Sequence, residues 1–596
     1  MIVDAWDVSN PVVSPDGRWV AYRQRPVGQA GERPVSEVWL AGEETPPRRL
    51  AAGSAPRWDP DSQSLCYLVD GTQLHRITLS GADILLLTWD VGIDDHLPLA
   101  DGVAFVAADE LTAEERRRLE DRDDAEVRGV FRPSRLRLLR DGQTRVLYGN
   151  RHVSEIAQQP GGGPFAVLTR SSPEFDPGLL EPELHVVGLD GSCRDLGPAV
   201  VEAHSPVWRR AGDWRPGDWR PGDWRIAYLA LTPPSLQSGL AVYDVVDGNL
   251  TSGMAACPFE LVQTDMGDPL VVVADGLGTV VRRLSGPVIS RHTGLAKEIS
   301  VGSRRVAEIV STAYEPPNVY LDDVRLTDTR PWARDITWGT QTRLSYQAAD
   351  GLELDGLIIL PPTGTGPFPL VTIVHGGPYD RYSDQFALHW APSGQWLALA
   401  GHAVFLPNPR GSMGRGHEFA TSVTAAVGQE EWTDILTGID LLIADGVADA
   451  SRLGICGWSH GGFMTAWAIG HTDRFAAAVM GAGVTDWGML AGSGEWGLFE
   501  AALGGSTGWE GPGPHLHDEL SPISYASAVH TPVLIVHGAA DANVPLAQAE
   551  YFHRALRNYG AMHEFVVYPR EGHSFRERRH QLDLLRRTRA WFDRWL

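Results

Sequence analysis

The sequence predicts a chain of two parts, a β-propeller of about seven blades at residues 1–330 and a doubly wound α/β domain at residues 331–596. Three observations support this prediction. The first part repeats a polar turn followed by an apolar strand, and the second part alternates buried strands with helices. The chain of 596 residues is also too long for one ordinary domain, because domains usually span about 100–200 residues.

The repeating unit of the first part is a turn rich in Gly or Asp, followed by an apolar or aromatic strand. The first two copies start 45 residues apart, which is close to the period of a propeller blade. The turns lie at Asp16-Gly17, Asp61-Ser62, Asp101-Gly102, Gly162-Gly163, Asp223, Asp275-Gly276 and Gly302-Ser303. Seven copies indicate about seven blades. A β-sandwich, in which turn signals recur every ~8–12 residues, is the alternative.

A direct repeat of the five residues GDWRP runs from Gly212 to Arg225 in the first part. Its Gly-Asp and Arg-Pro-Gly steps favour turns, so we interpret it as a duplicated surface loop. A ligand site formed by its tryptophan side chains is the alternative interpretation.

The second part contains short β-branched runs bounded by Gly or Pro, which are typical of strands buried on both faces of a parallel sheet. These runs lie at residues 369–375, 402–407, 452–456, 532–537 and 563–569. Helical segments are predicted between them, among others at Asp434–Ala444 and Pro545–Tyr559. Strands that alternate with helices in this way predict a doubly wound sheet.

The most informative motif is Gly-Trp-Ser-His-Gly at residues 457–461, a G-x-S-x-G pattern centred on Ser459. A buried strand precedes the motif, and a helix of small residues follows it. In this context the serine occupies a strained turn that raises its hydroxyl above the sheet and points the helix N-terminus at developing negative charge. The pattern therefore predicts an α/β-hydrolase domain with Ser459 as its nucleophile.

A serine hydroxyl is a weak nucleophile that needs a base, and the base needs a carboxylate to orient it. In α/β-hydrolases the chain order is Ser, Asp, His, with both partners in loops after later strands. Asp541 follows the strand at 532–537, and His573 follows the strand at 563–569. We predict that Ser459, Asp541 and His573 form a catalytic triad at the carboxyl ends of the strands. The alternatives are a turn aspartate and a surface histidine.

Two backbone N–H groups are predicted to stabilise the negatively charged oxygen of the tetrahedral intermediate. One belongs to His460, the residue after the nucleophile, and the other to Gly377 in the glycine-rich turn that follows the first parallel strand. The elbow directs the His460 side chain away from Ser459, so we do not interpret it as a second base. His375 and His537 end strands and are expected to order loops.

The composition excludes several classes of partner and cofactor. A net charge of -24 repels phosphate backbones, so no nucleic-acid partner is expected. No Gly-rich loop precedes Lys297, the single lysine, so a Walker-type phosphate site is excluded. The H-x-H pair of His515 and His517 has no third ligand nearby in the sequence, so neither a metal nor another cofactor is expected.

The sequence also predicts a cytoplasmic location. Its four cysteines are scattered and form no C-x-x-C pair, which is typical of free thiols in a reducing compartment. The N-terminal residues lack the pattern of a signal peptide, and no apolar run approaches the ~18 residues needed to span a bilayer, so no membrane interaction is expected. The cysteines are Cys66, Cys193, Cys257 and Cys456.

Six motifs together resemble the prolyl oligopeptidase family of serine peptidases, and within it the branch of acylaminoacyl peptidases and dipeptidyl-aminopeptidase-like enzymes. The resemblance implies a β-propeller that caps an α/β-hydrolase domain, with the triad and the N–H donors given above. Relatives cleave acyl-amino acids, dipeptides or short peptides, and some inactivate small amide compounds. The motifs are HGGP at His375, NPRGSMGRG at Asn408, DASRLGICGWSHGGFMT ending at Thr465, SPISYA at Ser521, HGAADANVP at His537 and YPREGHSF at Tyr568.

The resemblance also implies where the first residue of the substrate binds. In this branch the S1 pocket is formed by the segment after the strand that follows the elbow helix, which here offers Val484, Trp487, Trp496 and Phe499. An apolar pocket of this kind would prefer an apolar P1 side chain. The alternative is that these side chains pack only in the core.

One departure from the family concerns the acyl group of the substrate. Acylaminoacyl peptidases commonly have an arginine two residues after the triad aspartate, where it binds the P2 carbonyl, but this chain has Asn543. The substitution implies less dependence on an acyl group and favours a free α-amine at P1. The alternative is that Arg381 or Arg410 reaches the same place.

The leading hypothesis is a serine peptidase that hydrolyses short peptides or aminoacyl amides through an acyl-enzyme, as an aminopeptidase-type exopeptidase with an apolar P1 preference. An amidase or esterase that inactivates a small non-peptide amide compound is the alternative, because it would use the same residues. A binding protein with an inactive hydrolase domain is disfavoured by the intact triad. The propeller is expected to exclude large substrates. The sequence does not decide whether the protein forms a homo-oligomer.

Overall fold

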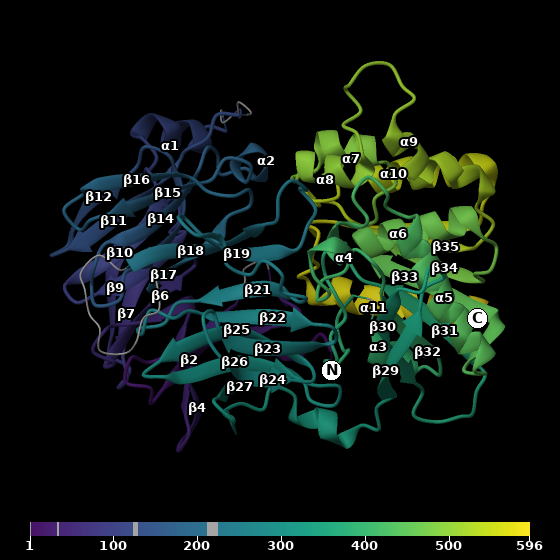
Figure 1. Cartoon of the computed structure of the whole chain (residues 1–596), viewed down its shortest axis with the longest axis horizontal. Helices are drawn as coiled ribbons and strands as arrows, with labels where there is room; N and C mark the ends of the chain where they lie inside the picture. Colours follow the sequence, from purple (N-terminus) through teal and green to yellow (C-terminus); the bar gives the residue numbers. More distant parts are fainter. Residues whose placement is uncertain (1, 32–34, 123–124, 126–128, 211–223, 392) are drawn as a thin grey trace.

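The computed structural model describes residues 2–31, 35–122, 125, 129–210, 224–391 and 393–596. Nearly all of the GDWRP repeat lies outside the described residues, so its interpretation as a loop or a ligand site stays open. The chain folds into a β-propeller and an α/β-hydrolase domain that lie side by side (Figure 1).

Seven four-stranded antiparallel sheets form the propeller, which confirms the predicted number of blades. Each blade is built from four strands that are consecutive in the sequence, so no strand is exchanged between the first and last blades. The first four blades are β1 (Trp6–Val13), β2 (Val20–Pro26), β3 (Glu37–Gly42) and β4 (Thr45–Ala52); β5 (Ser54–Trp58), β6 (Ser64–Val69), β7 (Gln73–Thr78) and β8 (Asp83–Thr88); β9 (Asp95–Leu99), β10 (Gly102–Ala108), β11 (Ser134–Arg140) and β12 (Gln143–Tyr148); and β13 (His152–Gln158), β14 (Phe165–Arg170), β15 (Glu183–Val187) and β16 (Cys193–Pro198). The last three are β17 (His204–Arg210), β18 (Trp224–Leu231), β19 (Leu240–Asp244) and β20 (Gly248–Asn249); β21 (Cys257–Val262), β22 (Leu270–Asp275), β23 (Gly278–Arg283) and β24 (Val288–His292); and β25 (Leu295–Gly302), β26 (Arg305–Ser311), β27 (Asn318–Leu321) and β28 (Val324–Arg325).

Six of the seven predicted repeats mark the second strand of a blade, namely β2, β6, β10, β14, β18 and β26. The copy at Asp275-Gly276 differs, because this turn joins β22 to β23, the second and third strands of the sixth blade. Both positions are hairpin turns between antiparallel strands, and such turns use the same residues wherever they occur in a blade.

Carboxylate side chains on the inner strands hydrogen-bond to backbone N–H groups of the next blade. Glu155 accepts from Ser205 at 2.7 Å, Glu260 accepts from Glu298 at 2.7 Å, and Glu298 accepts from Asn10 at 2.6 Å. Burial raises the pKa of both Glu155 and Glu260. The bond from Asn10 to Glu298 joins the first blade to the last, so the ring is closed by non-covalent contacts.

The hydrolase domain contains one eight-stranded sheet, in the order β29-β30-β32-β31-β33-β34-β35-β36. The six strands from β32 to the end of this order pair in parallel, and β30 pairs antiparallel with both of its neighbours, β29 and β32. All five predicted strands are present, although β36 is an edge strand and is only partly buried. The strands are β29 (Thr340–Gln347), β30 (Glu353–Leu360), β31 (Phe368–Val374), β32 (Ala403–Asn408), β33 (Ala448–Trp458), β34 (Ala477–Gly481), β35 (Val533–Gly538) and β36 (His563–Tyr568).

Helices cover both faces of this sheet and bury two separate apolar clusters. One cluster includes α5 (Glu430–Ala444), α6 (His460–His471) and α10 (Ala547–Tyr559), and the other includes α3 (Gly394–Ala398) and α11 (Arg578–Trp595). No helix within the described residues is long and apolar enough to cross a membrane. The remaining helices are α1 (Ala113–Glu120), α2 (Phe175–Gly178), η1 (Pro331–Asp335), α4 (His417–Thr421), α7 (Trp487–Ser493), α8 (Leu498–Gly504), α9 (Leu516–Leu520) and η2 (Pro522–Ala528).

Candidate active site

Ser459 occupies the sharp turn between β33 and α6, with φ 60° and ψ -121°. A positive φ is unusual for a residue other than glycine, and such strain is typical of functional sites. The glycines two residues away on each side are required sterically. A Cβ at Gly457 would lie 2.4 Å from the backbone of Gly461, and a Cβ at Gly461 would lie 2.1 Å from the carbonyl oxygen of Val374.

The predicted base and its carboxylate are in direct contact. His573 Nδ1 lies 2.8 Å from Asp541 Oδ2, and the other carboxylate oxygen accepts the Val544 N–H at 3.0 Å. His537 donates from Nε2 to the Val544 carbonyl at 2.7 Å, and burial lowers the pKa of this histidine. His537 therefore orders the loop that carries Asp541, as expected from its place at the end of β35.

The three predicted triad residues follow strands that end at the same edge of the sheet, where open α/β sheets place their sites. Ser459 follows β33, Asp541 follows β35 and His573 follows β36. Ser459 and Ser574 line one cavity, so the loop of His573 reaches the elbow.

The glycine-rich turn after β31 lies against the nucleophile. A Cβ at Gly376 would be 3.6 Å from the Cβ of Ser459, and Gly377 lines the same cavity as Ser459 and His460. Gly377 has φ 109°, which favours glycine, and its N–H has no acceptor among the described residues. His460 begins α6, where backbone N–H groups have no acceptor within the helix. Both N–H groups are thus free to bind an oxyanion.

The His460 side chain points away from Ser459 into the core, as predicted, and meets a carboxylate that the sequence did not indicate. Its Nε2 lies 3.1 Å from Glu431 Oε2, and the two side chains are only 4% and 2% exposed. The Gly428 N–H donates to the other oxygen of Glu431 at 2.5 Å. Glu431 therefore fixes the residue whose backbone N–H is a predicted oxyanion donor.

A cavity of about 340 Å³ opens on Ser459 at the interface between the two domains. Trp496, which lines it, stacks on Phe175 of the propeller with ring centroids 4.6 Å apart, so both domains enclose the cavity. All five predicted substrate-binding residues line it, namely Val484, Trp487, Trp496, Phe499 and Asn543. Val484, Trp487 and Phe499 are also nearly fully buried. These side chains therefore both pack in the core and line the cavity.

Two carboxylates that the sequence analysis missed line this cavity as well. Glu500 comes from α8 of the hydrolase domain, and Glu202 comes from the propeller. Burial raises the pKa of Glu500 to about 8 and that of Glu202 to about 7. No local pattern distinguishes these residues in the sequence, because only the tertiary fold brings them to one cavity.

A second cavity, of about 610 Å³, reaches Ser459 between β1 and β25 of the propeller and the hydrolase domain. It is lined by Trp458 and Ser574 near the nucleophile and by Arg25 and Lys297 from the propeller. Ser459 therefore lies between two cavities, which could hold the parts of a substrate on either side of the scissile bond.

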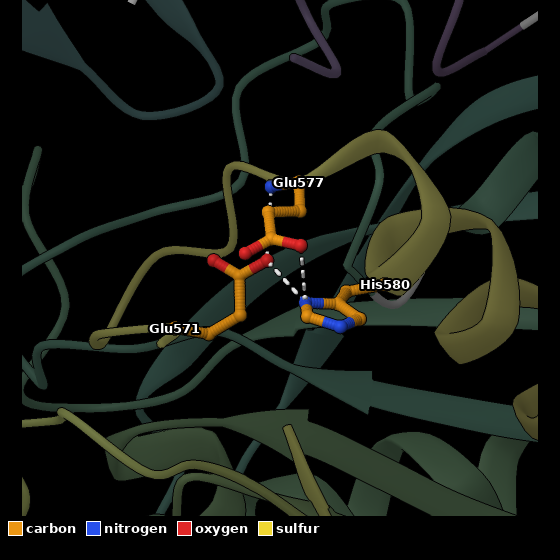
Figure 2. A group of neighbouring side chains, drawn as sticks. All are labelled: Glu571, Glu577 and His580. Atoms are coloured by element: carbon orange, nitrogen blue, oxygen red, sulfur yellow. Dashed lines mark hydrogen bonds and ion pairs between the residues drawn. The ribbon is translucent and has the colours of Figure 1, made fainter. Parts of the chain in front are cut away.

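Glu571, Glu577 and His580 form the one group in the described part of the chain whose ligand atoms lie close enough to hold a metal (Figure 2). Glu571 is 2% exposed and accepts from His580 Nδ1 at 2.8 Å, from the Glu577 N–H at 2.9 Å and from the Arg576 N–H at 2.7 Å. These donors already satisfy the buried carboxylate. We therefore infer that these hydrogen bonds fix the conformation of the loop that carries His573.

The same loop is attached to the first blade of the propeller. The Gln29 N–H donates to the Arg576 carbonyl at 2.8 Å, and the Arg578 N–H donates to the Gln29 carbonyl at 2.9 Å. Gln29 lies in the connection between β2 and β3 and forms a short parallel bridge with Glu577. The first blade thus contributes directly to the position of the His573 loop.

A strained serine elbow, a hydrogen-bonded Asp–His pair and a capping propeller define this chain as a propeller-capped serine hydrolase. The prolyl oligopeptidase family model matches residues 389–596, which make up most of the hydrolase domain.

Three similar proteins illustrate this relationship. The uncharacterized peptidase YuxL of Bacillus subtilis is 25% identical, over 99% of this chain and 98% of its own length. The acylamino-acid-releasing enzyme of Arabidopsis thaliana is 31% identical, but over only 38% of this chain and 30% of that enzyme. The structure of the Pyrococcus horikoshii acylaminoacyl peptidase has the same fold, with a TM-score of 0.82 and 20% identity over 99% of this chain and 96% of that one.

Proposed function

We propose that the protein releases an N-terminal residue with an apolar side chain from short peptides or aminoacyl amides, through an acyl-enzyme on Ser459. The observation that carries this proposal is the cavity of about 340 Å³ that opens on Ser459 and whose predicted S1 side chains, Val484, Trp487, Trp496 and Phe499, are apolar. Burying an apolar P1 side chain there contributes roughly 1.5–3 kcal/mol, whereas an unpaired charge would be costly.

In this proposal the Ser459 hydroxyl attacks the carbonyl carbon while His573 takes its proton. Asp541 orients the imidazole through the bond to Nδ1, and the Gly377 and His460 N–H groups stabilise the oxyanion. His573 then protonates the leaving amine, and a water molecule hydrolyses the acyl-enzyme by the same steps.

The environment of Asn543 supports a free α-amine at P1. Neither Arg381 nor Arg410 lines the cavity of about 340 Å³ that Asn543 lines, although Arg381 lines the second cavity at Ser459, and both arginines bind other groups. Arg381 donates to the carbonyl oxygen of Gly278 at 2.7 Å, and Arg410 donates to Asp434 at 2.9 Å. A charged donor to the P2 carbonyl contributes about 1.5–3 kcal/mol, and here an acyl group would gain no such bond.

The test compares kcat/KM for Phe-, Leu-, Asp- and Lys-anilide and for acetyl-Phe-anilide. We expect Phe or Leu to exceed Asp or Lys by at least about tenfold, and Trp487→Ala to reduce this difference. Asn543→Arg should shift preference toward acetyl-Phe-anilide. A wild-type preference of roughly a hundredfold for the acetylated substrate would contradict the proposal.

The second candidate function is hydrolysis of a small non-peptide amide or ester. A puromycin-hydrolyzing peptidase of Mycobacterium tuberculosis shares the fold, with a TM-score of 0.69 and 21% identity over 100% of this chain and 95% of that one, which favours this candidate. An ester control in the same panel, together with non-peptide amides, distinguishes it. Turnover of these compounds well above that of every peptide would select the amidase.

A cytoplasmic location is part of the proposal. It is supported by the four cysteines, which are free in the structure. Cell fractionation with an antibody would test the location, and size-exclusion chromatography with light scattering would test for a homo-oligomer.

A further inference from the structure

Glu500 is a buried carboxylate for which the protein supplies no counter-charge. It lines the cavity beside Ser459 and is 7% exposed. Its Oε2 has no hydrogen-bond partner among the described residues, and the carboxylate interacts with the backbone N–H of Gly497 but with no basic side chain in that part of the chain. Buried carboxylates are normally paired, so one that faces a substrate cavity with an unsatisfied oxygen and no counter-charge indicates a ligand of opposite charge.

The other ionisable groups in and near the cavity are mostly acidic. Glu202 also lines it, and Glu495 is close enough to raise the pKa of Glu500, although burial has the larger effect. Among the described residues that line the cavity, the one basic side chain is His460, and it is bonded to Glu431. The cavity therefore holds two acidic groups in apolar surroundings. Their raised pKa values keep Glu500 largely protonated and Glu202 partly protonated near pH 7 while the cavity is empty, and a bound ammonium group would favour the charged carboxylate, because an ion pair is stronger there than in water.

The carboxyl group of Glu500 lies close to the loop that carries Asp541. A Cβ added at Gly494 would lie 2.4 Å from Glu500 Oε2 and 3.0 Å from the carbonyl oxygen of Asn543. Both oxygens thus lie against the same glycine. Asn543 is two residues after Asp541, so the carboxylate sits beside the triad loop.

We propose that Glu500 binds the α-ammonium group of the first substrate residue, with the Asn543 carbonyl as a second acceptor. An ammonium group has three donors and needs several acceptors around it, which this corner of the cavity provides. A bond between two charged groups is about twice as strong as a neutral one. This inference rests on the proposed aminopeptidase function and names the group that selects its substrates.

A basic P1 side chain would present the same chemistry to Glu500. We favour the α-ammonium because the carboxylate lies next to the triad loop and the surrounding S1 residues are apolar. The experiment distinguishes the α-ammonium from a basic side chain by using substrates that carry only one of the two amines.

The experiment uses the full chain and three substrates of similar size: Phe-anilide, 3-phenylpropionyl-anilide, which lacks only the amine, and acetyl-Lys-anilide, which carries only a side-chain amine. The wild type should prefer Phe-anilide to the des-amino substrate by at least about tenfold in kcat/KM. Glu500→Gln should remove this preference and change turnover of the des-amino substrate less than roughly threefold, because it removes the charge and keeps the shape.

Two further variants complete the design. Glu500→Asp keeps the charge and should restore part of the preference, whereas the exposed neighbour Glu495 is the control, and Glu495→Gln should leave most of it. Labelling of Ser459 by a fluorophosphonate probe shows that each variant is folded. If Glu500→Gln lowered turnover of all three substrates equally, the carboxylate would be structural and the inference wrong.

The outcomes separate this inference from the proposed function. If the wild type preferred acetyl-Phe-anilide to Phe-anilide by a hundredfold, the function itself would be contradicted. If the wild type preferred Phe-anilide but Glu500→Gln retained that preference, only the role of Glu500 would be overturned. Loss of acetyl-Lys-anilide turnover alone in Glu500→Gln would assign the carboxylate to a basic side chain and would also overturn the inference.

Discussion

The indole nitrogen of Trp458 donates a hydrogen bond of 2.9 Å to the backbone carbonyl of His573. The same ring packs edge-on against Phe575, with centroids 5.1 Å apart. Gly481 leaves the room for it, since a Cβ there would lie 2.2 Å from the indole. The residue that precedes the predicted nucleophile therefore holds the loop of the predicted base, and the two are positioned as one unit.

Trp458→Phe removes this donor and keeps most of the ring volume. We expect kcat to fall about fivefold while KM changes little, because a neutral hydrogen bond contributes about 1 kcal/mol. Steady-state kinetics with Phe-anilide measures both constants. Trp595→Phe is the matched control, because the Trp595 nitrogen has no partner among the described residues. Equal effects of the two substitutions would contradict the proposed coupling.

Ser459→Ala should lower kcat by at least about three orders of magnitude, because only binding and the oxyanion donors remain. A fluorophosphonate probe should label the wild type at Ser459, as peptide mapping would show, and should not label the variant. Labelling at another serine, or undiminished turnover, would contradict the assignment.

The buried pair of Glu431 and His460 should be important for stability. Glu431→Ala leaves a buried polar group without its partner, a change that costs about 3–5 kcal/mol when the pair is ionic. Its neighbour Glu430 provides the control, because it is 65% exposed and Arg410 keeps its bond to Asp434 without it, so Glu430→Ala should cost less than about 1 kcal/mol. Thermal and denaturant unfolding measure both. Similar losses in the two variants would contradict this prediction.

The stability of the wild type should fall as pH rises from about 4.5 to about 8, in part because of Glu500. Burial raises the pKa of this carboxyl from 4.5 to about 8. In that window the folded state keeps a proton that the unfolded state releases, so raising the pH favours unfolding. Glu500→Gln removes the effect, and its Tm relative to the wild type should therefore rise by at least ~2 °C across the window. Glu495→Gln should show no such trend.

The propeller should exclude large substrates, because both domains enclose the cavity at Ser459. We expect a five-residue peptide to be cleaved at least about tenfold faster per bond than casein. Mass spectrometry of timed digests gives both rates. Equal rates per bond would show that the propeller does not limit access.

The sequence was sufficient wherever a short segment determines its own structure. Gly457 and Gly461 are required by contacts within the elbow itself, so the pattern predicts the turn at Ser459. Hairpin turns likewise predicted the number of blades. They did not predict which strand each turn precedes, and the copy at Asp275 is assigned to a different strand for this reason.

Groups that meet only through tertiary packing could not be predicted. Glu202 and Glu500 come from different domains, and each is an isolated acidic residue in its own segment. Glu431 was visible only as half of an acidic pair in a helix. Its role follows from burial beside His460, which depends on how α5 packs against α6.

The bridge between Gln29 and the segment at residues 576–578 limits how the chain can be divided. The sequence places the boundary between the propeller and the hydrolase domain between residues 330 and 331. A fragment that starts at residue 331 would lack the connection between β2 and β3, which holds the His573 loop. Such a fragment would retain every residue of the predicted triad and still lose one support of its base. A transplanted hydrolase domain that keeps this support therefore has to include the first blade.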